Sequence, residues 1–207
     1  MKKIYTCLIL AFFTGLNLMQ SQENDYSKFR VLMLSGIGNG IAENDNEVNY
    51  VLNTNTSEIL LNYKFSKIYG VATGVGINEM RGNGFNSLGN FFHKRTYIKI
   101  PVLLTGDYDV SDKIKVLFTL GVYTQNIIKD EYSFVDIKAK NVYEGWNFGT
   151  QISFGFLFEI FENYSIGLNY LGLSDFSKLE TKENASFGDK QKIVNLNTVG
   201  LTLLFEF

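Results

Sequence analysis

The stretch WNFGTQISFGFLFEI, residues 146–160, alternates large apolar residues with small or polar ones at every second position. An amphipathic helix repeats its apolar residues every three or four positions, so this period indicates an extended strand with two unlike faces. The same alternation recurs through most of the chain. It predicts eight strands, at about 29–41, 58–65, 69–77, 96–108, 114–125, 146–160, 164–174 and 193–207.

The connections between these strands alternate in length. Short polar turns stand at 66–67, 110–112 and 161–163, whereas the other connections are long polar segments, at about 42–57, 80–95, 129–144 and 175–192. Tight turns at one end and long loops at the other are typical of an up-and-down antiparallel barrel. We therefore expect an all-β fold, an eight-stranded antiparallel up-and-down transmembrane β-barrel, with four loops at one end and both termini at the other.

The polarity of the two faces separates a membrane barrel from a soluble one. One face carries mainly Gly, Ala, Ser, Thr, Asn and Gln, which suits a narrow interior better than a solvated surface. The other face is apolar and nearly free of charge, as lipid contact requires, because a Lys or Arg there costs about 2–4 kcal/mol at mid-membrane. An aromatic content of 15% with 19 glycines and one proline fits such strands. A soluble lipocalin-like ligand-binding barrel, with the apolar face inside, is the alternative.

The first residues indicate export. Lys2 and Lys3 precede an apolar run at 4–18, and the small residue Ser21 follows, which is the pattern of a secretory signal peptide. We predict a removed signal peptide at 1–21 and an outer-membrane β-barrel domain at 22–207. Removal takes away both lysines and Cys7, the only cysteine, and changes the formal net charge from −2 to −4. Without a basic cluster, no nucleic-acid partner is expected.

Several charged residues fall on the face assigned to the interior. An eight-stranded barrel is only wide enough for its side chains, so opposite charges there are expected to pair and close the lumen. We expect Arg30 to pair with Glu206, since the first and last strands meet at closure, and Asp107 to face Lys115 across a short turn. The predicted lumen charge network consists of Arg30, Lys64, Lys99, Asp107, Lys115, Glu159 and Glu206.

Aromatic residues on the lipid face are expected to form girdles at the two membrane edges. Trp146 falls toward the long-loop end, and Tyr164, Phe205 and Phe207 fall near the short-turn end.

No pattern indicates catalysis or a cofactor. The single histidine, His93, lies in a long polar segment and is expected to be solvated; an outer-membrane enzyme acting on lipid or peptide would need it to find Ser87 or Asp130 as a partner. The acidic run at 43–47 is the best calcium candidate, but it lacks a glycine-containing ligand loop and is expected to be solvated. We predict no catalytic residue, no metal and no cofactor.

The segment RTYIKIPVLLTGDY, residues 95–108, resembles the central strand of the PorT-like outer-membrane β-barrel family of Bacteroidota. Tyr97, Ile100 and Pro101 match its motif, and the resemblance implies that they are structural. Pro101 also removes a backbone donor, so a bulge or local distortion is expected there. The resemblance implies a small outer-membrane barrel without known catalytic residues, in a family with one member in a protein-secretion apparatus.

These observations predict a non-enzymatic protein of the cell outer membrane, exported through the periplasm. The final Phe on an alternating strand resembles the signal read by the barrel-assembly machinery. The expected partners are outer-membrane lipid, that machinery during insertion, and an envelope protein that contacts the loops, in an envelope or secretion complex.

Overall fold

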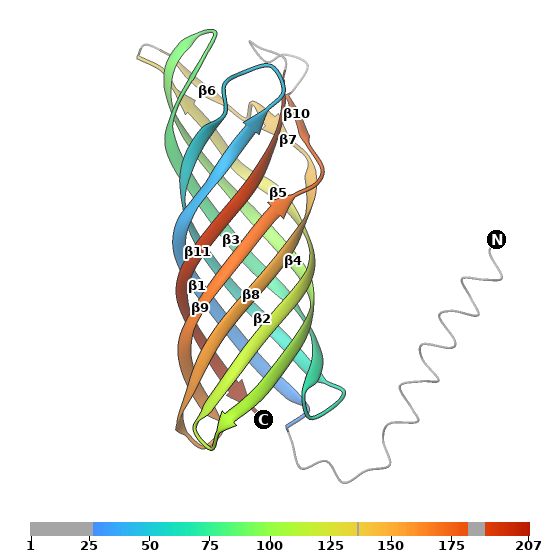
Figure 1. The fold of residues 1–207 in the computed structure, drawn as a ribbon. Coiled ribbons are helices and arrows are strands. Elements are labelled where there is room, and N and C mark those ends of the chain that lie inside the picture. Colours follow the sequence, from blue (N-terminus) through green and yellow to red (C-terminus); the bar gives the residue numbers. More distant parts are fainter. Residues whose placement is uncertain (1–26, 136, 182–188) are drawn as a thin grey trace, which may run out of the picture.

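The computed structural model describes residues 27–135, 137–181 and 189–207, so the predicted signal peptide lies outside the described residues. Eight long antiparallel strands form a closed ring in chain order (Figure 1). The ring closes through β1 and β11, which pair from Arg30 opposite Glu206 to Asn44 opposite Gln191. The predicted fold class is confirmed. The ring strands are β1 (Phe29–Asn44), β2 (Tyr50–Lys64), β3 (Tyr69–Asn86), β4 (Gly89–Ser111), β5 (Ile114–Ser133), β8 (Trp146–Phe161), β9 (Tyr164–Asp175) and β11 (Lys190–Glu206).

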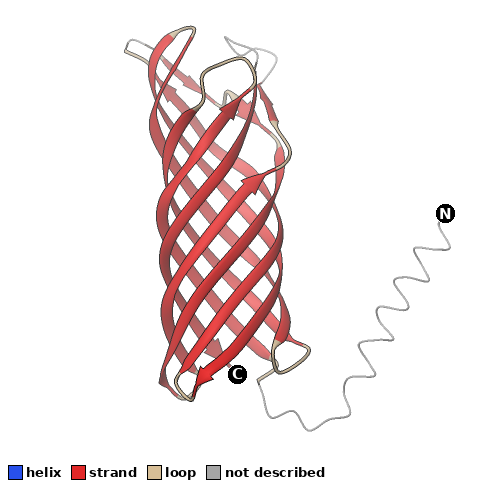
Figure 2. Ribbon diagram, in the orientation of Figure 1, coloured by secondary structure: helices blue, strands red, loops and turns tan. Residues whose placement is uncertain are grey.

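Three short strands extend the sheet at the loop end. These are β6 (Lys138–Lys140), β7 (Tyr143–Glu144) and β10 (Leu179–Thr181). β6 pairs with β5, and β10 links β11 to β7. Strands account for nearly all of the described chain (Figure 2). Among the described residues, no helix is long and apolar enough to cross a bilayer.

The predicted long loops are wrong in part, because strands continue through much of them. β3 and β4 pair up to Asn86 opposite Gly89, so the connection predicted at 80–95 is only Ser87 and Leu88. The outward residues of this hairpin are mostly polar, as at Arg81, Asn83 and Lys94, so the apolar alternation ends while the backbone ladder continues. Its interior is a separate polar and aromatic core. Strand residues beyond the apolar zone therefore lack the pattern that identified the rest.

Large apolar side chains cover the outside of the barrel. Their relative exposure is 61% at Leu168 and 57% at Val102, for example, whereas Arg30 and Lys99 inside are fully buried. The soluble-barrel alternative is therefore wrong, because the polarity is the reverse of what it requires. The belt of exposed apolar residues spans about five outward positions per strand, as at Tyr69, Val71, Thr73, Val75 and Ile77 on β3.

Pro101 disturbs one ladder and leaves the register intact. On the β4–β5 side the pairing continues through Pro101 opposite Tyr123. On the β3–β4 side the pairs run from Thr73 opposite Val102 to Gly76 opposite Lys99, with no pair recorded between them. The expected local distortion is present, as a gap in the ladder without a bulge in the register.

At Gly74 the neighbouring strand lies too close to leave room for a side chain. A Cβ at this position would lie 2.0 Å from the Ile59 carbonyl oxygen, whereas at Gly106 the nearest atoms would be 3.8 Å away on the Tyr69 ring. We expect Gly74→Ala to lower the free energy of unfolding by about 1–3 kcal/mol, as other overpacking substitutions do. Urea titration in lipid vesicles measures it, with Gly106→Ala as the matched control. Equal effects of the two substitutions would contradict the close approach.

Candidate functional site

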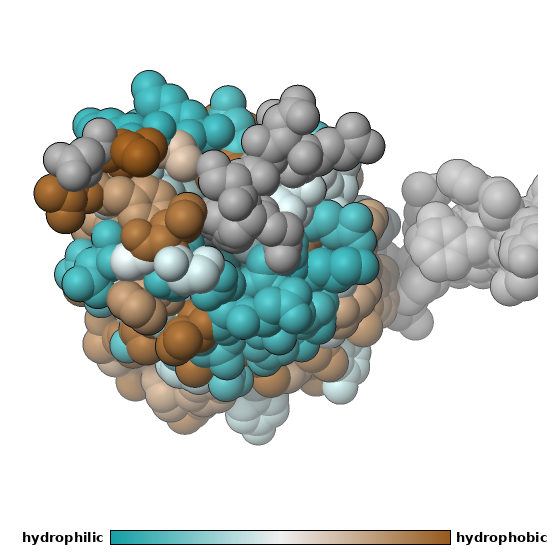
Figure 3. All heavy atoms as spheres, turned by 90° about the horizontal axis from the view of Figure 1, so that it is seen from above, coloured by the Kyte–Doolittle hydropathy of each residue, from teal (hydrophilic) through white to brown (hydrophobic). Residues whose placement is uncertain are grey.

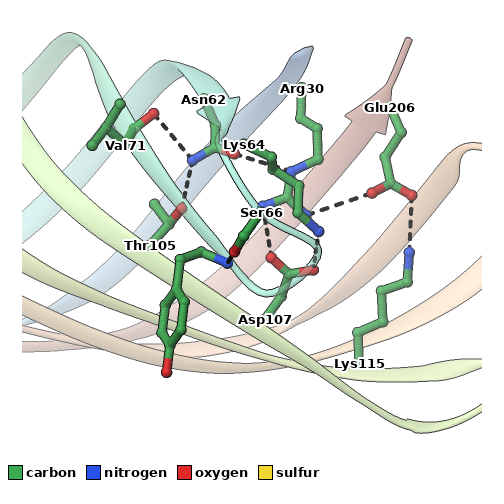
Figure 4. Close-up of polar contacts among 10 residues, drawn as sticks. Arg30, Asn62, Lys64, Ser66, Val71, Thr105, Asp107, Lys115 and Glu206 are labelled. Atoms are coloured by element: carbon green, nitrogen blue, oxygen red, sulfur yellow. Dashed lines mark hydrogen bonds and ion pairs between the residues drawn. The ribbon is translucent and has the colours of Figure 1, made fainter. Parts of the chain in front are cut away.

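The interior begins at the turn end with an ionic network. Arg30 on β1 donates from Nη2 to Asp107 Oδ1 at 2.9 Å, and Lys64 on β2 donates to Asp107 Oδ2 at 2.9 Å (Figure 4). Arg30 Nε also donates to Asn62 Oδ1 at 3.1 Å, and Asn62 in turn donates to Thr105 Oγ1 at 2.7 Å. The Asp107 carboxylate thus partly compensates the positive charges of two buried cations, Arg30 and Lys64.

Glu206 extends the same network from the last strand. Its Oε1 lies 3.5 Å from Arg30 Nη1, as the closure of β1 on β11 leads one to expect, and its Oε2 accepts from Lys115 at 2.9 Å. The expected pair of Asp107 with Lys115 is wrong. The register places Asp107 opposite Leu117 and Lys115 opposite Asp109. Arg30 and Lys64 reach Asp107 across the lumen, which leaves Lys115 to Glu206.

Glu159 stands apart from this network. It is half-buried on β8 opposite Ser165, and within the described part of the chain it takes part in no ion pair. Six of the seven predicted lumen charges are therefore ion-paired: five in the turn-end network and Lys99 farther along the axis.

A layer of leucines separates the turn-end network from the rest of the lumen. They come from six strands, point inward from the level next to the network, and have relative exposures of 2% or less. The sequence predicted an inner face of mainly small and polar residues, and it did not indicate that the inward leucines gather in one layer. We call it the leucine layer: Leu32, Leu60, Leu103, Leu117, Leu157 and Leu204.

Above the leucine layer, Lys99 forms an ion pair with Glu58, and both side chains are fully buried. Gln151 completes the group: its Oε1 accepts from Lys99 at 3.0 Å and its Nε2 donates to Glu58 Oε2 at 3.0 Å. Glu58 was missed because the predicted strand only began there. Glu58 lies an even number of residues from Lys64 on β2, so extending the alternation of that strand would have placed both side chains in the lumen.

Asp175 fills the next level of the lumen. Its carboxylate accepts hydrogen bonds from Tyr123 at 2.5 Å, Gln125 at 3.1 Å and Asn147 at 2.6 Å, and from the backbone N–H of Ile193 at 2.8 Å. Four donors from three other strands, β5, β8 and β11, hold this single carboxylate in place.

The prediction for His93 is wrong, because the side chain is fully buried inside the loop end of the barrel. The continuation of β4 past the apolar belt places His93 on the inward face. Its Nε2 lies 2.8 Å from Asp130 Oδ1, and its Nδ1 lies 2.8 Å from the Tyr50 hydroxyl. The ring also stacks on Tyr132, with centroids 4.0 Å apart. Of the two partners considered from the sequence, Asp130 is in contact, whereas Ser87 binds Glu47.

Asp130 sets the protonation of this group. It accepts from His93 Nε2 and from Arg95 Nε, both at 2.8 Å, and from the Tyr143 backbone N–H at 3.1 Å. Burial by itself would raise the pKa of Asp130, but the neighbouring Arg95 and His93 outweigh burial and lower it. Burial, with Arg95 as the second cause, lowers the pKa of His93 to about 4. His93 is therefore neutral near pH 7, donates from Nε2 and accepts from Tyr50 at Nδ1.

Arg95 joins the remaining members of the loop-end network. Its Nη1 donates to Gln191 Oε1 at 2.5 Å and to the Tyr97 hydroxyl at 3.1 Å, and its Nη2 lies 3.4 Å from the Tyr132 hydroxyl. Gln191 donates in turn to Tyr50 at 3.1 Å. Arg95 and Gln191 were not predicted because they lie in segments expected to be loops, and Asp130 was considered only as a partner of His93.

The order hydroxyl, imidazole, carboxylate in Tyr50, His93 and Asp130 is that of a nucleophile activated by a base. The surroundings oppose this chemistry. All three side chains are buried, and Asp130 is already neutralised by Arg95. The cavity bordered by Tyr50 and Tyr132 has a volume of only about 10 Å³, room for about one water molecule.

The acidic run at 43–47 is divided among different partners. Glu43 pairs with Lys192 at 3.0 Å, Asp45 pairs with Lys178, and Glu47 accepts from Ser87 Oγ at 2.8 Å. Within the described residues, no three His, Cys, Asp or Glu side chains come together as metal ligands.

The remaining predicted residues lie on the wall of the barrel. Tyr97 is fully buried, whereas Ile100 faces outward with a relative exposure of 39%. Trp146 is exposed where β8 begins at the loop end. Tyr164 and Phe205 contact each other at the turn end, with ring centroids 4.8 Å apart. Phe207 is exposed there, and its backbone N–H donates to the Phe29 carbonyl oxygen at 3.1 Å.

Solved structures of similar fold are outer-membrane proteins. Neisserial surface protein A is 10% identical over 89% of this chain and 100% of its own, with a TM-score of 0.56. The outer membrane protein OprG from Pseudomonas aeruginosa is 13% identical over 88% of this chain and 98% of its own, with a TM-score of 0.51. No protein-family model matches the sequence, and no curated protein matches it significantly. The chain has the fold of a bacterial outer-membrane β-barrel, and its apolar belt agrees with the predicted location in the outer membrane.

Removing one partner of the Lys99–Glu58 ion pair should lower the stability of the barrel. Lys99→Met leaves the Glu58 carboxylate buried without its cation, so we expect a loss of about 3–5 kcal/mol in the free energy of unfolding. The double variant Glu58→Leu and Lys99→Met should regain most of this loss. Urea titration in vesicles measures the free energy of unfolding of the wild type and of each variant. If the loss in the double variant equals the sum of the losses in the two single variants, Glu58 and Lys99 are not coupled.

His93 should make stability depend on pH. Because its pKa is about 4 when folded and 6.5 when unfolded, the unfolded chain binds the extra proton. The contribution of His93 is complete above pH 6.5 and is lost as the pH falls toward 4, by up to about 3 kcal/mol at 1.36 kcal/mol per pKa unit. Subtracting the unfolding curve of His93→Gln from that of the wild type isolates this term. A difference that stays constant between pH 7 and 4 would show that folding does not lower the pKa of His93.

Proposed function

We propose that this protein is a non-enzymatic integral outer-membrane barrel whose lumen is sealed by its own side chains and whose function is exercised at the loop end. One observation carries the proposal: the interior is filled from end to end, by the turn-end ionic network, the leucine layer, the Lys99 and Asp175 groups and the loop-end network. A solute path would need a continuous space lined by polar groups, and the leucine layer interrupts one.

The loop end supports a contact role. Hydrophilic residues cover much of this end, and hydrophobic side chains gather at one edge (Figure 3). Phe85, Leu88 and Val135 are exposed at the tips with relative exposures of 56%, 54% and 92%. Exposed apolar residues bordered by polar ones are a common feature of protein contact sites. An envelope protein, as a component of an envelope or secretion complex, is the partner we propose.

The PorT-like family of Bacteroidota is the finer assignment that we propose. The motif from Tyr97 to Leu104 supports it, together with the structural positions of its residues: Tyr97 is buried beside Arg95, and Pro101 lies at the gap in the β3–β4 ladder. An enzyme at the loop end is the less favoured function, since the Tyr50, His93 and Asp130 group that would supply it is enclosed.

Conductance tests the sealed lumen. We expect the purified barrel to insert into planar bilayers without steady current, while a wide porin in the same apparatus conducts. Insertion is verified separately, by the shift in gel migration between unheated and boiled samples. Steady ohmic current from inserted wild-type barrels would contradict the closure by the leucine layer and the ionic groups.

A further inference from the structure

Basic residues gather on one outer side of the barrel, where β3, β4 and β5 rise above the apolar belt. All of them are exposed. Among the described residues of this side, five are basic and two, Glu79 and Glu131, are acidic. We call this set the basic collar: Arg81, Lys94, Lys129, Lys138 and Lys140.

The strand register places two of these cations directly opposite each other. Arg81 on β3 is the cross-strand partner of Lys94 on β4. Like charges in this position repel, so the arrangement costs stability in the isolated barrel. Neither residue takes part in an ion pair within the described residues. An anion placed between them would remove the repulsion.

The nearest carboxylate of the collar is shared. Glu131 lies opposite Lys94 and opposite Lys140, and its oxygens are 3.8 Å from Lys129 Nζ and 3.9 Å from Lys138 Nζ. One half-buried carboxylate at such distances compensates only part of the charge of four cations. The basic collar keeps a net positive charge among its described members.

The other described lysines at the loop end, Lys178, Lys190 and Lys192, each have a carboxylate partner. Lys192 pairs with Glu43 at 3.0 Å, Lys190 pairs with Glu180 at 2.6 Å, and Lys178 pairs with Asp45. Among the described residues of the loop end, cations without an ion pair are therefore concentrated on the β3–β5 side.

The distance of the basic collar from the end of the apolar belt indicates which class of ligand can reach it. The apolar belt ends at Ile77 on β3 and at Ile98 on β4, and Arg81 and Lys94 each stand four residues beyond that end. Phe85 and Phe92 lie farther out, toward the tip of the hairpin. At about 3.3 Å per residue and a tilt of about 40°, this is about 10 Å along the barrel axis. The headgroup region extends about 5–8 Å beyond the hydrocarbon core, and Lys and Arg side chains bend toward it.

We propose that the basic collar binds the phosphate-bearing headgroup of an anionic lipid in the leaflet at the loop end. Phosphate oxygens lie between Arg81 and Lys94, Lys129 contacts the same headgroup from below, and the acyl chains lie on the apolar belt under Ile98. This inference rests on the membrane position in the proposed function. An acidic protein is the less favoured ligand, because the cations lie at headgroup height.

The test compares lipid binding by three purified barrels in detergent. They are the wild type, the double variant Arg81→Gln and Lys94→Gln, and the control Lys190→Gln and Lys192→Gln, which removes the same charge from the opposite side. Phosphatidylglycerol and phosphatidylcholine are titrated in turn, and bound lipid is counted by native mass spectrometry. A shift in gel migration on boiling reports the fold of each barrel.

The wild type and the control should bind phosphatidylglycerol more tightly than phosphatidylcholine. The double variant should lose about thirtyfold in affinity for phosphatidylglycerol, at about fivefold per cation, which corresponds to about 1 kcal/mol for each. It should unfold at a urea concentration equal to or above that of the wild type in neutral detergent, since the repulsion is removed. Inorganic phosphate at the same concentration should not displace the lipid.

Three results would overturn the proposal. They are equal losses in the double variant and the control, no preference of the wild type for the anionic lipid, and displacement by inorganic phosphate, which would indicate a site for free anions. If the double variant does not fold, the affinity of Lys129→Gln for phosphatidylglycerol replaces it and should be lower than that of the wild type. The preference of the wild type for phosphatidylglycerol should also disappear at high salt, and no change in either experiment would overturn the proposal. Barrels that fold but show no lipid preference refute this inference alone, whereas barrels that fail to enter vesicles refute the proposed function.

Discussion

Closure of the backbone ladder is the constraint on which this structure depends. Inside a bilayer no water satisfies a free N–H or C=O, so a sheet is stable there only without edges. The pairing of β1 with β11 provides this closure over nearly the full length of both strands. Once the ring is closed with eight strands, the lumen is too narrow to hold bulk water, and each inward side chain must find its partners there.

The interior meets this demand in different ways along the axis. At the turn end, two carboxylates and three cations bridge strands that are distant in sequence, as Arg30 and Asp107 do. In the leucine layer, packing replaces polar contacts. At the loop end, one ion pair, Arg95 with Asp130, is surrounded by aromatic rings and hydroxyls. The alternation of ionic and apolar levels keeps charged groups paired while filling the space.

The sequence predicted the wall of the barrel better than its contents. Period-two alternation located all eight ring strands because lipid imposes one polarity on every outward residue of the belt. Arg30 and Glu206 could be placed together because barrel closure alone makes their strands neighbours. Asp107 could not be assigned a partner, since contacts across the lumen depend on shear and side-chain length. His93 was misjudged because outside the bilayer a strand can be polar on both faces, and the alternation that identifies it disappears.

The leucine layer also decides which side of the barrel can protonate the buried histidine. A proton moves through a protein interior along successive donors and acceptors, and leucine side chains carry neither. The relay that could start at Lys64 and Asp107 therefore stops at Leu32 and Leu60. Only acidity at the loop end can reach His93, so a bilayer with different pH on its two faces would titrate this residue from one face alone.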